Sequence, residues 1–206
     1  MPPKKFYVVW NGHTPGIYDT WAACEAQVKG YPNAQYKAFP TRQMAEAAWR
    51  ESYTDYAGKN TATQQWLFAS QPPVTPCLCV DAACAGVPGP VEYQGVRLPE
   101  MQTVFRQGPY PGGTNNIGEF LAIVHALAWL EHEKLAWPVY SDSETARAWV
   151  RAGKCRSEAV HTPENTALFD LVRRAEAWLA THRITTAILK WDTRAWGEIP
   201  ADFRRK

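Results

Sequence analysis

The sequence lacks three features that would assign it at once to a broad class. No apolar run approaches the ~20 residues that a membrane-spanning helix needs, so we expect no membrane contact. The formal net charge is only +2, too small by itself to indicate nucleic-acid binding. The cysteines number five and no secretory leader is evident before them, which predicts reduced thiols and a cytoplasmic location.

A zinc site is a poor interpretation of the cysteine cluster at Cys77, Cys79 and Cys84. A second Cys/His pair at finger-like spacing is missing, and buried small side chains explain these thiols more simply. With 206 residues, 46% of them hydrophobic, the chain is long and apolar enough for one or two domains with a real core.

The first fifty residues predict a small domain with the order ββαβα, spanning residues 1–51. Aromatic and β-branched residues indicate the strands, while Thr20 and Thr41 are plausible helix N-caps and Gly30 a plausible helix stop. The predicted elements are strands at 6–10, 17–19 and 33–39, a helix at 21–29 and a second helix after residue 41.

Four residues of this domain suggest a surface for a nucleic-acid duplex: Tyr7, Trp21, Tyr36 and Lys37. Flat aromatic rings can stack on sugars or bases, and a lysine can neutralise a phosphate. The alternative is that these aromatic side chains form the core of a very small domain, since large apolar residues are usually buried.

Residues 5–51 resemble the N-terminal hybrid-binding domain of ribonucleases H1, which also occurs in the caulimovirus protein viroplasmin. The resemblance rests on the segments KFYVV (5–9), PGIYDTW (15–21), QVKG (27–30) and YKAF (36–39). It implies that Tyr7, Trp21, Tyr36 and Lys37 face an RNA–DNA hybrid. Ala38 stands where many members have a second basic residue.

Residues 52–73 predict a linker, and the pattern changes after it to the order βββαβααβ in a second domain, residues 74–206. That order indicates an α/β fold, a mixed sheet with helices on its faces. Strands are expected at 77–81, 91–97, 101–106, 139–141 and 185–191, with a Gly/Pro-rich loop at 108–113. Helices are expected at 116–131 and 144–152 and from 162 on.

Carboxylates occur where the strands of this second domain end. Asp81 and Asp142 each follow a short apolar run, Glu119 heads a helix that is apolar on two sides, and Asp202 lies near the end of the sequence. Strand ends and a crossing helix can converge, and grouped acids repel one another unless cations neutralise them. We therefore interpret the four as one divalent-metal site, for Mg²⁺ with Mn²⁺ as a substitute. Acids at strand ends are common, so the spacing alone is a weak signal.

The second domain resembles the catalytic domain of ribonuclease H1. The segments DAACAGVPG (81–89), TNNIGE (114–119), YSDS (140–143) and GEIPAD (197–202) are similar to the four active-site motifs of that family, in the same order. The resemblance implies a ribonuclease H-like mixed five-stranded sheet and a monomeric hydrolase that cuts the RNA strand of RNA–DNA hybrids. Products would carry 5′-phosphate and 3′-hydroxyl ends.

The same resemblance implies a role for each acid. Asp81 would bridge two metal ions, Asp202 would join it on the ion that activates water, and Glu119 and Asp142 would hold the other ion. Asn115 and Asn116 would reach the minor groove, where the 2′-hydroxyl distinguishes RNA.

Three alternatives stay open at the level of sequence. Asp192 also follows a predicted strand and could replace Asp202 as the fourth ligand. The chain could bind hybrids or RNA without cutting them. It could also be a nuclease of the same fold that acts on double-stranded RNA.

Overall fold

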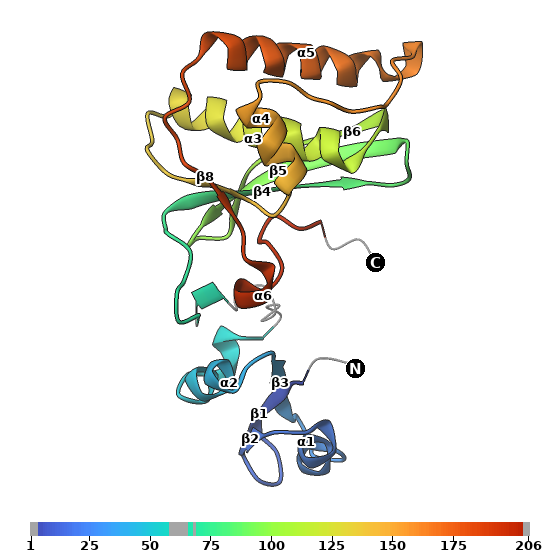
Figure 1. Ribbon diagram of the computed structural model, residues 1–206. Helices are drawn as coiled ribbons and strands as arrows, with labels where there is room; N and C mark the ends of the chain where they lie inside the picture. The colour runs from blue at the N-terminus through green and yellow to red at the C-terminus, as the bar shows by residue number, and fades with distance from the viewer. Residues whose placement is uncertain (1–3, 58–65, 68, 204–206) are drawn as a thin grey trace. The chain divides into compact units, whose positions relative to one another are not determined.

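The computed structural model describes residues 4–57, 66–67 and 69–203, and these residues form two compact units (Figure 1). The N-terminal unit comprises residues 1–72 together with 194–198, and the C-terminal unit comprises 73–193 and 199–206. Much of the predicted linker, residues 58–65 and 68, lies outside the described residues.

The N-terminal unit is built on a three-stranded antiparallel sheet with the order β2-β1-β3. Two helices accompany the sheet, and each begins where a threonine side chain accepts a backbone N–H: Thr20 from Ala23 and Thr41 from Met44. The elements are β1 (Phe6–Asn11), β2 (Gly16–Tyr18), α1 (Trp21–Val28), β3 (Gln35–Phe39) and α2 (Arg42–Trp49). This is the predicted ββαβα order.

The packing of this unit continues past the helix α2. A short 3₁₀ turn, η1 (Tyr53–Asp55), follows, and Tyr56 after it stacks on Trp10 with ring centroids 5.8 Å apart. The Trp10 indole also donates a 3.0 Å hydrogen bond to the carbonyl of Glu51. Residues 52–57 therefore pack on the small core of this unit, formed by Val8, Phe39, Met44, Ala45 and Ala48.

The C-terminal unit contains the predicted mixed five-stranded sheet, with the strand order β6-β5-β4-β7-β8. The central strand β4 pairs antiparallel with β5 and parallel with β7. The strands are β4 (Cys77–Cys84), β5 (Gly89–Leu98), β6 (Gln102–Gly113), β7 (Val139–Ser141) and β8 (Ile188–Lys190). The predicted fold class is confirmed.

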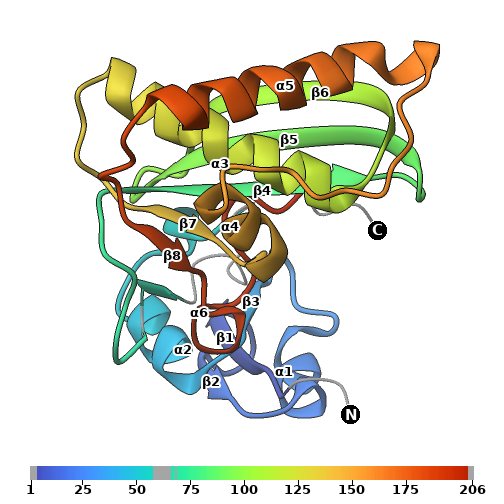
Figure 2. The ribbon, with the colours of Figure 1, turned by 45° about the horizontal axis from the view of Figure 1, so that its top comes forward.

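One face of this sheet carries the main helices. Figures 1 and 2 show α3 (Asn115–His132) against the sheet and α5 (Thr166–Thr181) outside it. Leu78 and Val80 of β4 point to this face and join Phe120, Ile123 and Leu168 in its core. This unit also contains α4 (Glu144–Arg151) and η3 (Pro163–Asn165), whereas most of α6 (Thr193–Trp196) falls in the segment 194–198 that belongs to the N-terminal unit. None of the helices among the described residues combines the length and apolar character that a membrane crossing requires.

The opposite face of β4 carries Cys77, Cys79 and Asp81, because side chains alternate along a strand. All five cysteines are free thiols, and Cys77 and Cys79 are fully buried. Tyr140 and Trp191, with rings 5.8 Å apart, are also buried. Ile199 and Ala201, which precede Asp202, are buried as well.

The prediction of a loop at residues 108–113 is wrong, because β6 continues to Gly113. Val91 pairs with Tyr110 and Gly89 with Gly113, with irregularities in the register between them. β6 is the edge strand of the sheet, where proline and glycine are tolerated at bulges. The predicted last strand is shorter than expected, since β8 covers only Ile188–Lys190.

Candidate active site

Strand register places Asp81 beside Asp142. The parallel strands β4 and β7 pair Leu78 with Val139 and Cys79 with Tyr140, so two residues further along each chain the register reaches Asp81 and Asp142. Ser141 of β7 pairs in turn with Lys190 of β8, and the N–H of Trp191 donates to the Ser141 carbonyl at 3.1 Å. The sheet thus fixes the backbone of both acids.

Glu119 reaches the same place from helix α3. The helix begins at Thr114, whose hydroxyl accepts the N–H of Ile117 at 3.4 Å. One residue before Glu119, Gly118 lies so close to the sheet that a Cβ there would come within 2.6 Å of Val91 Cγ1 and 2.7 Å of the Ala82 Cβ. The missing side chain lets the helix approach the sheet and bring Glu119 to Asp81.

Asp81, Glu119 and Asp142 form a cluster in which one carboxylate oxygen of each lies within 4.8 Å of the others. Asp81 and Glu119 are each only 8% exposed. Three carboxylates at this spacing are the hard oxygen donors that Mg²⁺ and Mn²⁺ prefer, and a cation would relieve their mutual repulsion. The donor set therefore fits a divalent metal.

The electrostatics of the three acids agree with such a site. Burial, and then the charge of Asp142, raise the pKa of Asp81 to about 8. Burial also raises the pKa of Glu119 and of Asp142, the first opposed by a hydrogen bond from Ser143 and the second by the positive charge of Lys190. Each acid is held in a place where its charged form is costly without a cation.

Asp202 approaches this cluster without joining the 4.8 Å group found among the described residues. Its charge contributes to raising the pKa of both Asp81 and Asp142. Asp192, the alternative fourth ligand, is exposed and lies two residues after the end of β8.

Three neighbours of the cluster were not predicted from the sequence. The Ser143 hydroxyl interacts with Glu119, Lys190 forms an ion pair with Glu144 close to Asp142, and the Gln94 amide donates a 2.7 Å hydrogen bond to the Ala201 carbonyl. Ser143 also caps α4, since its hydroxyl accepts the N–H of Ala146. For Gln94, the only advance signal would have been the strand register, which pairs it with Asp81.

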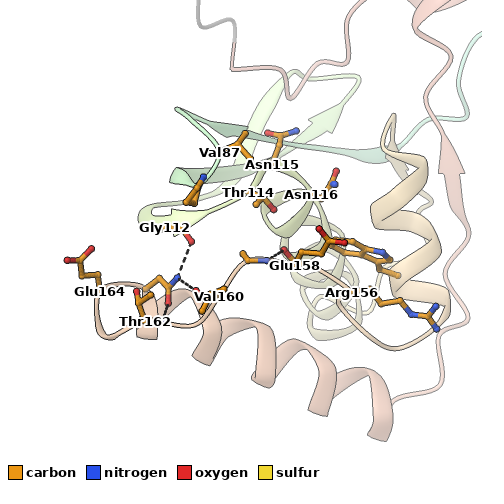
Figure 3. A pocket seen from close by; sticks show the side chains of 15 residues that line it. Val87, Gly112, Thr114, Asn115, Asn116, Arg156, Glu158, Val160, Thr162 and Glu164 are labelled. Carbon is orange, nitrogen blue, oxygen red and sulfur yellow. Dashed lines mark hydrogen bonds between the residues drawn. The ribbon is translucent and has the colours of Figure 1, made fainter.

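Asn115 and Asn116 lie at the start of α3, on the rim of a pocket of about 820 Å³ (Figure 3). Asn115 also donates a 2.8 Å hydrogen bond to the Glu119 carboxylate, so it belongs to both the pocket and the cluster. The pocket's far wall is held by the buried Asn165, whose amide donates to the carbonyls of Gly112 and Val160 at 3.1 and 3.0 Å. The charged residues that line the pocket are Arg156, Glu158 and Glu164.

The N-terminal unit brings together three of its four predicted nucleic-acid-binding residues. The Trp21 ring lies 5.6 Å from the Tyr7 ring and 5.8 Å from the Tyr36 ring. Trp21 and Tyr36 are 43% and 40% exposed, so they are not core residues. We refer to Tyr7, Trp21 and Tyr36 as the aromatic strip.

Lys37 lies on the other face of that sheet. Lys37 pairs with Val8, whereas Tyr36 pairs with Val9 and Ala38 with Tyr7. Paired residues of an antiparallel sheet share a face, so Ala38 accompanies the aromatic strip and Lys37 accompanies the core residue Val8. The Lys37 ammonium donates to the carbonyl of Tyr56. The structure therefore separates Lys37 from the other three residues.

Comparisons with known proteins identify the first unit. Residues 5–49 match the family model described as the ribonuclease H1 N-terminal domain. A ribonuclease H of Crithidia fasciculata is 52% identical over 47 residues, which are 23% of this chain and 9% of that protein. The transactivator/viroplasmin protein of cauliflower mosaic virus (strain CM-1841) is 43% identical over 53 residues, which are 26% of this chain and 10% of the viral protein. The match thus spans about a tenth of the length of these curated relatives.

Solved structures also resemble the chain, at low identity. A ribonuclease H1 isolated from compost by a metagenomic approach is 19% identical, with a TM-score of 0.38, over 56% of this chain and 82% of that one. The ribonuclease H1 of Halobacterium salinarum NRC-1 is 21% identical, with a TM-score of 0.36, over 55% of this chain and 83% of that one. The family match and the relatives agree on one point: residues 5–49 resemble the N-terminal domain of ribonucleases H1.

Proposed function

We propose that this chain is a metal-dependent endonuclease that hydrolyses the RNA strand of RNA–DNA hybrids and leaves 5′-phosphate and 3′-hydroxyl ends. The observation that carries the proposal is the buried cluster of Asp81, Glu119 and Asp142, whose carboxylate oxygens lie within 4.8 Å of one another. A second support is the ribonuclease H1 N-terminal domain in the same chain.

Asp81, Glu119, Asp142 and Asp202 would hold two Mg²⁺ ions, or Mn²⁺ in their place. The ions, when bound, would supply an activated water and stabilise the charge that develops on the scissile phosphate. The chain's own contribution is to fix the acids in position: Asp81 and Asp142 through strand register, and Glu119 through the Asn115 amide. The exposed Asn115 and Asn116 would contact the minor groove of the hybrid next to the cluster.

The N-terminal unit would bind the hybrid through the aromatic strip. Stacking of sugars or bases on aromatic rings tolerates many sequences, which suits an enzyme that must act on hybrids in general. Attachment of such a module raises the effective concentration of hybrid at the catalytic unit.

The first experiment is cleavage of a hybrid with a 5′-labelled RNA strand, in Mg²⁺ or Mn²⁺, by the wild type, Asp142→Asn and Asp192→Asn. We expect metal-dependent cutting of the RNA strand that Asp142→Asn abolishes and Asp192→Asn preserves. Cutting that survives Asp142→Asn contradicts the proposed site. Double-stranded RNA and a DNA duplex, tested beside the hybrid, define the substrate.

A second function follows from the match of residues 5–49 to the ribonuclease H1 N-terminal domain. In this function the chain binds hybrids without cutting them. Tight hybrid binding by the wild type, with no cleavage in either metal, would establish it in place of the nuclease.

A further inference from the structure

Three residues lie in one row across the sheet of the C-terminal unit. Asp81 of β4 pairs with Gln94 of β5, and Gln94 pairs with Arg106 of β6. Paired residues in antiparallel strands project from the same face, so the three side chains lie on the face opposite α3. Only Asp81 belongs to the carboxylate cluster, and the proposed function assigns no task to the other two.

Gln94 and Arg106 contact the two residues that flank Asp202. The Gln94 amide donates to the carbonyl of Ala201 at 2.7 Å, on one side of Asp202. The Arg106 guanidinium lies 5.1 Å from the centre of the Phe203 ring, on the other side. Cations at this distance from an aromatic face are attracted to it.

The row is itself fixed in place. Arg106 forms an ion pair with Glu92, with Nη2 and Oε2 2.7 Å apart, and Glu92 is 8% exposed. The segment before Asp202 is anchored too, because Ile199 and Ala201 are buried and the Asp202 N–H donates to the Ile199 carbonyl at 2.9 Å. The position of Asp202 relative to Asp81 therefore depends on contacts made by Gln94 and Arg106.

We infer that Gln94 and Arg106 are positioning residues, which hold Ala201 and Phe203 and thereby place the Asp202 carboxylate next to Asp81 as a metal ligand. The inference rests on the proposed function, since it assigns Asp202 to that metal site. Gln94 and Arg106 act through Asp202 and need no contact of their own with metal or hybrid.

The test is a measurement of Mn²⁺ affinity by electron paramagnetic resonance on the full chain, which needs no turnover. Gln94→Leu keeps the size of the side chain and removes its donor, and we expect it to weaken Mn²⁺ binding by about 10- to 100-fold, the usual effect of losing a group that orients a metal ligand. In hybrid cleavage, the same variant should need more metal for half-maximal rate while retaining most of its rate at saturating metal. Gln107→Leu is the matched control, because Gln107 lines a pocket with Tyr93 and His125 on the α3 face of the sheet.

A double-mutant cycle shows whether Gln94 acts through Asp202. In an Asp202→Asn background, Gln94→Leu should cause no further loss of Mn²⁺ affinity. An equal loss in both backgrounds would overturn the inference. Arg106→Met, which removes the charge and keeps the stem, provides an independent variant if Gln94→Leu lowers the unfolding midpoint.

The outcomes separate this inference from the proposed function. A wild-type chain that binds no Mn²⁺ overturns both. Wild-type Mn²⁺ binding and cleavage that Gln94→Leu and Arg106→Met leave unchanged overturn the positioning role alone.

Discussion

The Asn115 amide donates a 2.8 Å hydrogen bond to the carboxylate of Glu119, one turn further along α3. This bond joins the rim of the 820 Å³ pocket to the carboxylate cluster, because Asn115 belongs to both. A residue that contacts the bound duplex would thus also orient a candidate metal ligand.

Asn115→Ala should therefore weaken metal binding as well as hybrid binding. We expect metal affinity to fall by about 10-fold or more, as for other groups that orient a metal ligand. Calorimetric titration with Mn²⁺ in the absence of nucleic acid measures this effect. Asn116→Ala is the control from the same pocket rim, and equal metal affinity in the two variants would contradict the orienting role.

The stability of the metal-free chain should fall as pH rises. The pKa of Asp81 is raised to about 8, above the value near 3.9 of an unfolded chain, so between these values the folded state holds a proton that the unfolded state releases. The free energy of unfolding then decreases by up to about 1.4 kcal/mol per pH unit across this window. Urea unfolding at pH 5, 6.5 and 8, with and without Asp81→Asn, measures the slope.

Asp81→Asn should flatten that slope and make the metal-free chain more stable than the wild type at pH 8. Mg²⁺ should stabilise the wild type at pH 8, because a ligand that binds only the folded state raises its stability. Mg²⁺ should have little effect on Asp81→Asn. Equal slopes in the two proteins would show that Asp81 is not buried in its neutral form.

Gly118→Ala should destabilise the C-terminal unit and impair catalysis together. The added Cβ would lie within 2.7 Å of Val91 and Ala82, so the helix must move away from the sheet and take Glu119 with it. Overpacking of this kind costs about 1–3 kcal/mol. Denaturant unfolding measures the cost, and Mn²⁺ affinity reports the displacement of Glu119.

A compensating substitution supplies the control for that prediction. Val91→Ala removes the nearer of the two groups that the new Cβ would meet, Val91 Cγ1, and leaves the Ala82 Cβ in place. In the Gly118→Ala background it should recover part of the Mn²⁺ affinity, although Val91→Ala alone is destabilising. A lack of recovery would place the cause elsewhere than in the contact between α3 and β5.

The two faces of the N-terminal sheet should respond differently to substitution. Trp21→Ala removes a stacking platform and should weaken hybrid binding by about 1–3 kcal/mol. Ala38→Lys adds a cation beside the aromatic strip and should strengthen hybrid binding. The slope of log binding constant against log salt concentration should become steeper by about one, because one more counterion is released. Fluorescence anisotropy with a labelled hybrid at several salt concentrations measures both effects.

Lys37→Met provides the contrast, because the Lys37 ammonium bonds the Tyr56 carbonyl on the other face. It should change the salt dependence of binding less than Ala38→Lys does. If the salt slope of Lys37→Met were shallower than that of the wild type by about one released counterion, the Lys37 ammonium would have to leave the Tyr56 carbonyl and contact a phosphate in the complex.

His125 should make the chain less stable in mild acid. Its ring is stacked on Phe105, with centroids 4.0 Å apart, and burial lowers its pKa below the usual value of about 6.5. In mild acid the unfolded state therefore binds a proton on His125 that the folded state does not bind. The free energy of unfolding then decreases as pH drops below about 6.5. His125→Leu should reduce this loss in the free energy of unfolding between pH 7 and pH 5.

The local elements of this protein were largely predictable from sequence. Thr20 and Thr41 were predicted as helix caps, and each accepts a backbone N–H at the start of its helix. These signals work because a cap and its partner are three residues apart, so no distant part of the chain intervenes. The mixed five-stranded sheet was also predicted, from the order of its elements and from the family resemblance.

The structure departs from the sequence-based predictions where the pairing of β-strands decides how residues are arranged. Residues 108–113 read as a loop because they contain glycine and proline, yet pairing with β5 extends β6 through them. Lys37 was grouped with Tyr36 because a lysine can neutralise a phosphate and because of the family resemblance, but adjacent residues of a strand point to opposite faces. Hydrogen-bond register and strand pleat, which a linear pattern does not display, decided both cases.

The sequence by itself determined which residues carry the chemistry: the acids that follow strands, the acid that heads an apolar helix and the aromatic residues of the first domain. Only the tertiary structure decided how they meet. Register between β4 and β7 brings Asp81 beside Asp142, and the side-chain-free Gly118 lets α3 bring Glu119 to them. Contacts of Gln94 and Arg106 place Asp202, because a carboxylate so distant in sequence from both residues can be positioned only by packing against the folded sheet.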